Sequence, residues 1–237
     1  MRTIAVLPIK TFAAAKQRLG GMLAGGSREA LAQAMFSDVL ASLRKVEGLH
    51  AVAVVTASRA AQAAAQGEGV IVLHDAAQSG QSAAALAGIR YATTRGFDRV
   101  LLVPGDVPLL DATEVDALLE RTARDPLCLV PDREGVGTNA ILMSPPSLIE
   151  PSFGPGSFER HLAAGRAAGL EARVEQVACL LHDIDTPQDL DDLTALLAQR
   201  RGLASRTRGA LRQLERSEAR GPQAVRRIDA PDSAARA

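Results

Sequence analysis

Residues 99–106 read RVLLVPGD, and this stretch does most to decide the fold class of the chain. Its continuous apolar run predicts a strand buried on both faces, which is typical of a parallel sheet. Ligands of open α/β sheets bind beyond the carboxyl ends of the strands, because the loops converge there. Asp106 follows the run after Pro104 and Gly105, so we expect it to lie at a ligand site.

Short apolar runs alternate with helical patterns on both sides of this strand. We predict strands over residues 3–8, 51–56, 70–73, 99–104, 127–130, 140–143 and 172–181, with a break in the last one at Ala178. We predict helices that begin at Ser27 and Ser157 and helices over residues 82–94, 113–124 and 187–200. The short separation of the runs at 127–130 and 140–143 indicates a local departure from strict βαβ order. The pattern therefore predicts an α/β domain with a mostly parallel sheet and helices on both faces.

Composition predicts one domain followed by a tail. Helical periodicity weakens beyond Gly202, so we expect the domain to span residues 1–200. Residues 201–237 carry nine arginines against four acidic residues, and we expect a basic, disordered tail there. The tail lacks interleaved aromatic residues, so we expect no nucleic-acid partner. On this basis removal of residues 205–237 should change neither activity nor stability.

Two classes of protein are excluded by simple features. No apolar run approaches the roughly 20 residues that a membrane span needs, so we expect a cytoplasmic protein with no membrane partner. Cys128 and Cys179 stand alone in apolar segments, which argues against a disulfide framework and against a cysteine metal site. The four histidines show no metal-ligand spacing.

Three cations follow the first predicted strand. Lys10, Lys16 and Arg18 lie in a short, alanine-rich loop where they have little packing role. Several positive charges on one loop suit a triphosphate. A merely solvated loop is the alternative.

Two aspartates near the predicted C-terminal helix complete the polar set. Asp183 and Asp185 in the segment HDIDTP are two residues apart, so in an extended chain they point to the same side. Together with Asp106 they predict a site for one or two Mg²⁺ ions. The alternative is that Asp106 caps a turn and that one of the other two only braces the helix start at Thr186.

Two glycine-rich stretches do not predict nucleotide folds of other classes. Residues 135–140 read GVGTNA, but they lead into an apolar run and not into a helix, which argues against a dinucleotide-binding fold. Residues 20–27 lack the Lys-Ser/Thr pair of a phosphate-binding P-loop. No serine or cysteine nucleophile motif is present.

Five strings in the same order resemble a known family. They are LPIKTFAAAKQRL, VLLVPGDVPLL, VPDREGVGTNAILM, FGPGSFERH and LHDIDTPQDL. They are similar to those of the guanylyltransferases of coenzyme F420 biosynthesis, which join GTP to 2-phospho-L-lactate or phosphoenolpyruvate. The similarity covers residues 1 to about 200 and implies a Rossmann-like nucleotidyltransferase fold.

The resemblance also implies roles for individual residues. It assigns the triphosphate to Lys10, Lys16 and Arg18, and Mg²⁺ to Asp106, Asp183 and Asp185. It assigns the phosphorylated acid to Thr138, Gly154 and Ser157. Ser157 starts a helix, where free backbone N–H groups favour an anion. The nucleotide is assigned to Pro8 together with Gly80, Gln81 and Ser82, although residues 80–84 read GQSAA where many relatives have GLNAA.

These assignments imply a reaction without a special base. The acceptor phosphate is already ionised at neutral pH and can attack the α-phosphorus of GTP, so catalysis needs positioning and charge neutralisation. We expect transfer of GMP to phosphoenolpyruvate or 2-phospho-L-lactate and favour the former. The alternatives are another acceptor, such as a sugar phosphate or molybdopterin, and a catalytically silent nucleotide-binding module. The sequence leaves open whether the chain forms a homodimer.

Overall fold

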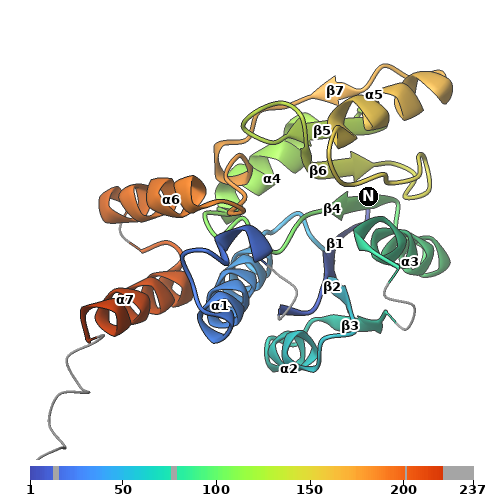
Figure 1. The fold of residues 1–237 in the computed structure, drawn as a ribbon. Coiled ribbons are helices and arrows are strands. Elements are labelled where there is room, and N and C mark those ends of the chain that lie inside the picture. The colour runs from blue at the N-terminus through green and yellow to red at the C-terminus, as the bar shows by residue number, and fades with distance from the viewer. Residues whose placement is uncertain (13–15, 76–78, 201, 221–237) are drawn as a thin grey trace, which may run out of the picture.

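The computed structural model describes residues 1–12, 16–75, 79–200 and 202–220. Its centre is a seven-stranded sheet with the strand order β3-β2-β1-β4-β6-β5-β7 (Figure 1). The strands are β1 (Thr3–Ile9), β2 (Ala51–Thr56), β3 (Ile71–His74), β4 (Arg99–Leu102), β5 (Leu127–Pro131), β6 (Thr138–Met143) and β7 (Arg173–Val174). Neighbouring strands run parallel except where β6 pairs antiparallel with β4 and with β5. The predicted mostly parallel sheet is confirmed.

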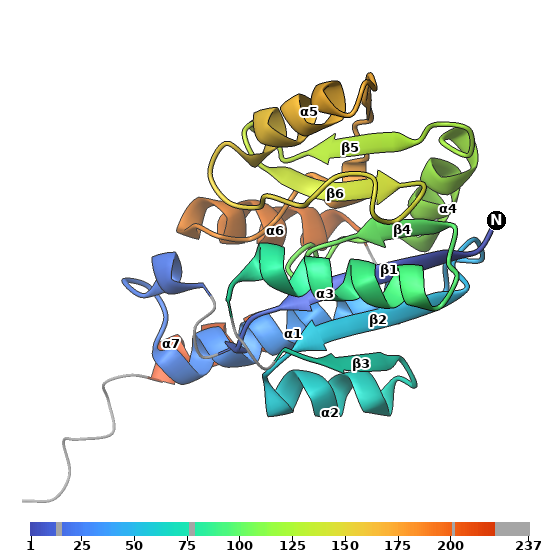
Figure 2. The same cartoon turned by 90° about the vertical axis from the view of Figure 1, so that its right-hand side faces the viewer.

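Helices cover both faces of this sheet, as predicted. They are α1 (Gly25–Leu43), α2 (Arg59–Gly67), α3 (Gln81–Thr94), α4 (Ala112–Arg121), α5 (Ser157–Ala167), α6 (Pro187–Gln199) and α7 (Ser205–Arg220). Helices α3 and α5 pack on one face of the sheet, and α1, α2 and α4 pack on the other (Figure 2). Strand residues alternate between these two apolar layers, so the central strands are buried on both sides. The helices that the structure describes include none that is long and apolar enough to cross a membrane.

Two local elements differ from the sequence prediction. Helix α2 was not predicted, because its alanine-rich stretch has no large apolar residues to mark a buried face; the side chain of Ser58 caps it by accepting the N–H of Ala61 at 3.3 Å. The strand predicted over residues 172–181 is reduced to the two residues of β7. A short 3-10 helix, η3 (Ala178–Leu180), begins where the break was predicted.

A β-bulge lies where β6 begins, and it reverses the faces of the sheet to which two successive side chains point. Val130 pairs with Ala140, but the next residue, Pro131, pairs with Thr138, so Asn139 is an extra residue on β6. The side chain of Thr138 meets α5, while that of Asn139 reaches the backbone of Leu180 on the other face. Bulges commonly re-aim side chains in this way beside functional sites. The predicted departure from strict βαβ order is confirmed by the antiparallel pairing of β5 with β6.

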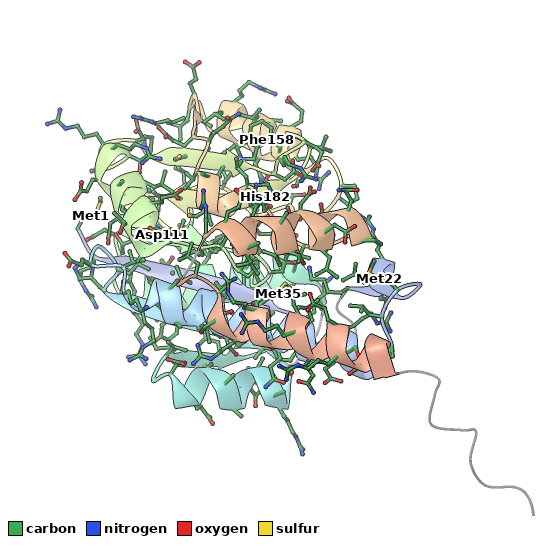
Figure 3. The ribbon with its side chains drawn as sticks, turned by 90° about the vertical axis from the view of Figure 1, so that its left-hand side faces the viewer. Met1, Met22, Met35, Asp111, Phe158 and His182 are labelled. Carbon is green, nitrogen blue, oxygen red and sulfur yellow. The ribbon has the colours of Figure 1, made fainter. Side chains whose placement is uncertain are left out.

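The C-terminal prediction is wrong for residues 205–220, which form helix α7. Leu211 is buried and Leu214 is partly buried in an apolar cluster with residues of α1 and α6. Figure 3 shows Met35 of α1 between α6 and α7, and Met35 belongs to the same cluster. Asp38 of α1 caps α7 by accepting the N–H groups of Arg206 at 3.1 Å and Thr207 at 2.7 Å. Residues 221–237, the rest of the predicted tail, lie outside the described residues.

Candidate functional site

A cavity of about 250 Å³ opens at the carboxyl ends of β1 and β4, where the topology places the ligand site of an α/β sheet. It collects residues from β1, the loop after it, α1, α3, the loop after β4 and the segment before α6. The lining is Pro8, Ile9, Lys10, Phe12, Lys16, Ala32, Phe36, Gln81, Pro104, Gly105, Asp106 and Asp185. Six of the predicted site residues, two of them predicted metal ligands, therefore share one cavity: Pro8, Lys10, Lys16, Gln81, Asp106 and Asp185.

Lys16 holds two of the predicted metal ligands together. Its ammonium donates to Asp106 and, at 2.9 Å, to Oδ1 of Asp185. Burial alone would lower the pKa of Lys16, but the charges of the two carboxylates outweigh it and raise the pKa. The residue adopts a left-handed backbone, φ 56°, directly before the short 3-10 helix η2 (Gln17–Leu19). Two carboxylates from distant parts of the sequence thus lie within reach of one cation.

Asp183 occupies the adjoining position. Its Oδ1 accepts a hydrogen bond from Nδ2 of Asn139 at 3.1 Å, and the same amide donates to the carbonyl of Leu180 at 2.7 Å. The pKa of Asp183 is raised to about 6, mainly by burial and then by the charge of Asp106, while the Asn139 hydrogen bond opposes the rise. The backbone N–H of Ile184 donates to the carbonyl of Asp106 at 3.2 Å. The three aspartates are therefore neighbours in the fold.

The donor set suits a magnesium ion that shares its coordination with a substrate. Among the described residues, no group of three or more carboxylate, histidine or cysteine side chains is arranged to hold a metal ion. Mg²⁺ commonly takes only one or two carboxylates and fills its other positions with water and phosphate oxygens. Asp106 and Asp185, which already share one cation in Lys16, meet that requirement.

Two further cavities adjoin the first and separate the predicted cations. One of about 180 Å³ shares Lys10 and Gln81 with it and adds Gly80; the other, of about 280 Å³, shares Asp185 and adds Arg18 and Asp183. Gly80 directly precedes α3 with φ 102°, a conformation that favours glycine. The hollow thus runs as a chain of three cavities, with Lys10 where the first two meet, Lys16 in the first cavity and Arg18 in the third.

The residues predicted for the acid gather beside α5. Oγ of Ser157 donates to Oγ1 of Thr138 at 3.3 Å, and Nδ1 of His161 lies 2.9 Å from the same oxygen. Gly154 belongs to the loop before α5, where Arg160 donates to the carbonyl of Ser152 at 2.8 Å. The lining of the three cavities, taken over the described residues, does not include these side chains.

Two sets of hydrogen bonds bear on the expectations about this region. Oγ of Ser82, the residue assigned to the nucleotide, accepts the N–H of Phe153 at 2.9 Å, so Ser82 supports the loop before α5. The N–H of Ser157 donates to Gly154 at 3.0 Å and that of Phe158 donates to Val136 at 3.1 Å. These two N–H groups at the start of α5 are therefore occupied, and the side chains carry the polar character of the region.

Sequence reasoning missed two residues of the site, Asn139 and His161. Ser157 and His161 are four residues apart on α5, a spacing that puts both on one helix face and could have indicated the histidine. Asn139 carried no such signal, because its direction depends on the bulge.

The family of the chain follows from comparison with known proteins. The family model described as "Guanylyl transferase CofC like" matches residues 3–218. The chain belongs to this family. The match extends across α7, beyond the expected domain end near residue 200, and it confirms the resemblance stated from the sequence motifs.

Relatives in this family include guanylyltransferases with different printed acceptors. A phosphoenolpyruvate guanylyltransferase of Conexibacter woesei is 47% identical over 92% of this chain and 98% of its own length. A 2-phospho-L-lactate guanylyltransferase of Methanothermobacter thermautotrophicus is 30% identical over 81% and 84%. A 3-phospho-D-glycerate guanylyltransferase of Colwellia psychrerythraea is 34% identical over 84% and 93%. The CofC-like chain is therefore a guanylyltransferase, an enzyme of the nucleotidyltransferase class.

A solved structure shows the same fold. A protein of Desulfovibrio desulfuricans, described as a nucleotide-diphospho-sugar transferase, aligns with a TM-score of 0.71 over 92% of this chain and 98% of its own. Its sequence identity is 18%, so the similarity concerns the fold. The expected Rossmann-like nucleotidyltransferase architecture is confirmed.

Proposed function

We propose that this chain transfers GMP from GTP to the phosphate of phosphoenolpyruvate, releasing pyrophosphate, in coenzyme F420 biosynthesis. The observation that carries the proposal is the pairing of Lys16 with Asp106 and Asp185 in a cavity that Lys10 also lines. Such a site offers cations to a triphosphate and carboxylates to its metal ion. Because GTP is the proposed donor, we expect the reaction to take place in the cytoplasm.

The proposed reaction balances without a protein base. An oxygen of the acceptor phosphate forms a bond to the α-phosphorus, and the bond from that phosphorus to the oxygen bridging toward the β-phosphorus breaks. Pyrophosphate leaves with the electron pair, and no proton needs to move. The work that remains is to align the two phosphates and to neutralise their charge.

Each part of the site then has a task. Lys10, Lys16 and Arg18 neutralise the triphosphate, and Lys16 can exchange its carboxylate partners for phosphate oxygens. Asp106 and Asp185, with Asp183 beside them, would hold Mg²⁺, which supplies Lewis-acid stabilisation of the developing charge when bound.

The two substrates meet from opposite ends of the site. Pro8, Gly80 and Gln81 line the nucleotide side of the hollow. On the acid side, Thr138 would offer its hydroxyl to the acid, and Gly154 and Ser157 would support it from the start of α5.

The relatives guide the choice of acceptor. The relative with 47% identity is named for phosphoenolpyruvate, and those named for 2-phospho-L-lactate and 3-phospho-D-glycerate are 30% and 34% identical. All three acids carry a phosphate and a carboxylate. They differ in a few atoms, and one pocket contact of that size is worth about 1–3 kcal/mol.

Pyrophosphate release is the direct test. The purified chain is assayed with GTP and Mg²⁺ and with each of the three acids, and kcat/KM is compared; the readout is pyrophosphate because it does not depend on the stability of the guanylylated product. We expect the highest kcat/KM for phosphoenolpyruvate. A tenfold preference for either other acid would overturn the acceptor choice.

Two controls separate the remaining alternatives. Assays with a sugar phosphate and with molybdopterin test for another kind of acceptor. Assays with CTP or ATP in place of GTP test whether the enzyme prefers guanine. Release with none of the acceptors would favour a silent nucleotide-binding module.

A further inference from the structure

His161 is a buried histidine whose two ring nitrogens both have partners. It is 0% exposed. The backbone N–H of Ser152 donates to Nε2 at 2.8 Å, and Nδ1 lies 2.9 Å from Oγ1 of Thr138. A backbone N–H can only donate, so Nε2 must be the unprotonated nitrogen. The neutral ring therefore carries its proton on Nδ1, facing Thr138.

This tautomer determines what the Thr138 hydroxyl can do. Oγ1 accepts from Nδ1 of His161 and also from Oγ of Ser157 at 3.3 Å. With both lone pairs used, the hydroxyl has only its own proton left to offer, and that proton points away from the two donors. Thr138 remains 7% exposed and Ser157 only 1%, so Thr138 is the member of the trio that can meet a ligand.

We propose that His161 is a positioning residue that fixes the Thr138 hydroxyl as a hydrogen-bond donor toward the phosphorylated acid. The inference rests on the proposed function and adds to it the residue that orients the acid site. A hydroxyl that can only donate suits an anion, which can only accept.

The location of Thr138 supports this reading. β6 runs antiparallel to β4, so its first residues lie at the carboxyl end of β4, where Asp106 follows. The next residue along β6, Asn139, donates to Asp183 at 3.1 Å. The bulge thus sends Asn139 to the carboxylates and Thr138 to α5, one residue apart.

The surroundings keep the histidine ring in place. The ring of Phe153 packs edge-on against it with 5.4 Å between centroids. The loop that supplies Ser152 is tied by Arg160, which donates to Oγ of Ser152 at 2.8 Å, and by Ser82, which accepts the N–H of Phe153. Burial, followed by the charge of Arg160, lowers the pKa of His161 to about 4, so the ring is neutral at neutral pH.

Two matched substitutions separate the two nitrogens. His161→Gln can still accept the Ser152 N–H but cannot donate to Thr138, whereas His161→Asn can donate to Thr138 but cannot reach Ser152. We expect His161→Gln to raise KM for the acid at least about tenfold, the loss expected for a hydrogen bond to a charged group, with KM for GTP unchanged. For His161→Asn, KM for the acid should stay within about threefold of the wild-type value.

A double-mutant cycle shows whether the effect passes through the hydroxyl. Thr138→Val should raise KM for the acid as much as His161→Gln does, and the double variant should be no worse than Thr138→Val. Fully additive effects, or an equal rise of KM for GTP, would overturn the inference and leave His161 with a structural role only.

The tautomer itself is read from the wild-type chain without any acid. Long-range ¹H–¹⁵N spectra of the histidine rings should show His161 protonated at Nδ1 and unprotonated at Nε2. A proton on Nε2 overturns the inference even in an active enzyme and even where the variants fail to fold. A chain that is inactive with all three acids would instead overturn the proposed function, and the acid-binding half of this inference with it.

Discussion

Two polar clusters flank the same end of the sheet and are built in different ways. The charged cluster consists of Lys16, Asp106 and Asp185 and is held by ion pairs. The neutral cluster consists of Thr138, Ser157 and His161 and is held by hydrogen bonds between uncharged groups. An ammonium can be replaced by a metal ion, and a carboxylate partner can be replaced by a phosphate, without leaving a charge unpaired. The charged cluster can therefore change partners during a reaction.

The neutral cluster offers no such exchange. Each of its hydrogen bonds has a defined donor, because the Ser152 N–H determines the tautomer of the histidine. It can therefore hold one group in one orientation. The difference suggests a division of labour in which charge handles the triphosphate and oriented hydroxyls handle the acid.

The largest expected effect comes from removing a charge from the charged cluster. Asp106→Asn should lower kcat by about 100-fold or more at saturating Mg²⁺, since the carboxylate neutralises developing phosphate charge through the metal ion. Asp191→Asn, an exposed change on α6, is the matched control and should leave kcat unchanged. Steady-state kinetics with melting curves checks both. A folded Asp106→Asn chain with near wild-type kcat would remove Asp106 from the metal site.

A smaller effect is expected from the cation of the same cluster. Lys16→Met should lower kcat by about 100-fold, the lower end of the range for one preorganised electrostatic contact. It also leaves Asp106 and Asp185 facing each other without the ammonium, so Mg²⁺ should raise the melting temperature of the variant more than that of the wild type. Thermal melts with and without Mg²⁺ check this, and equal shifts would show that Lys16 and the metal ion do not share these carboxylates.

Acid should break the neutral cluster. The pKa of His161, about 4, is below its ordinary value of 6.5, so the fold favours the neutral ring. The neutral ring contributes fully to the free energy of unfolding above pH 6.5. This contribution is lost as the pH falls toward 4, and the loss is roughly 3 kcal/mol at most. Burial lowers this pKa most, and the charge of Arg160 lowers it further. The Thr138, Ser152 and Phe153 groups that touch the ring are uncharged.

The contribution of His161 is isolated by comparison with a variant that cannot titrate. Urea unfolding of the wild type and of His161→Asn is measured at several pH values from 7 to about 4.5. The difference in unfolding free energy should shrink as the pH falls. Parallel pH profiles would mean that the ring is not held neutral.

Helix α7 provides a contrast to both clusters, because it should affect stability alone. Asp38→Ala removes the cap of α7 and should lower the unfolding free energy by about 1–2 kcal/mol, while Asp38→Asn, which keeps an acceptor, should cost less. kcat should stay unchanged in both. Removal of residues 205–237 should also lower the melting temperature, contrary to the expectation from composition. A truncated chain that melts like the wild type would show that Leu211 and Leu214 add nothing to the core.

Much of the site was predictable because its residues lie at fixed places relative to strand ends. The apolar run of residues 99–104 predicted both a buried strand and a ligand position at Asp106. In the structure Asp106 lines a cavity. Lys10 and Lys16, from the loop after β1, line the same cavity. Parallel strands bring their carboxyl ends to one edge, so local pattern was enough to predict this convergence.

Other features depend on contacts between distant segments, and only the tertiary structure decided them. The register of β5 against β6 makes Asn139 a bulge residue, and the side chain of Thr138 therefore points toward His161. A period-two pattern alone does not predict this change of face. Helix α7 looked like a charged tail because its cap, Asp38, lies far away in sequence on α1. The amino-acid sequence by itself determined the central strands, the alternation of strands and helices around them and the chemistry carried to the sheet edge. Pairing and direction came from the packed chain, because a hydrogen bond or an apolar contact stabilises a segment only after folding has placed its partner beside it.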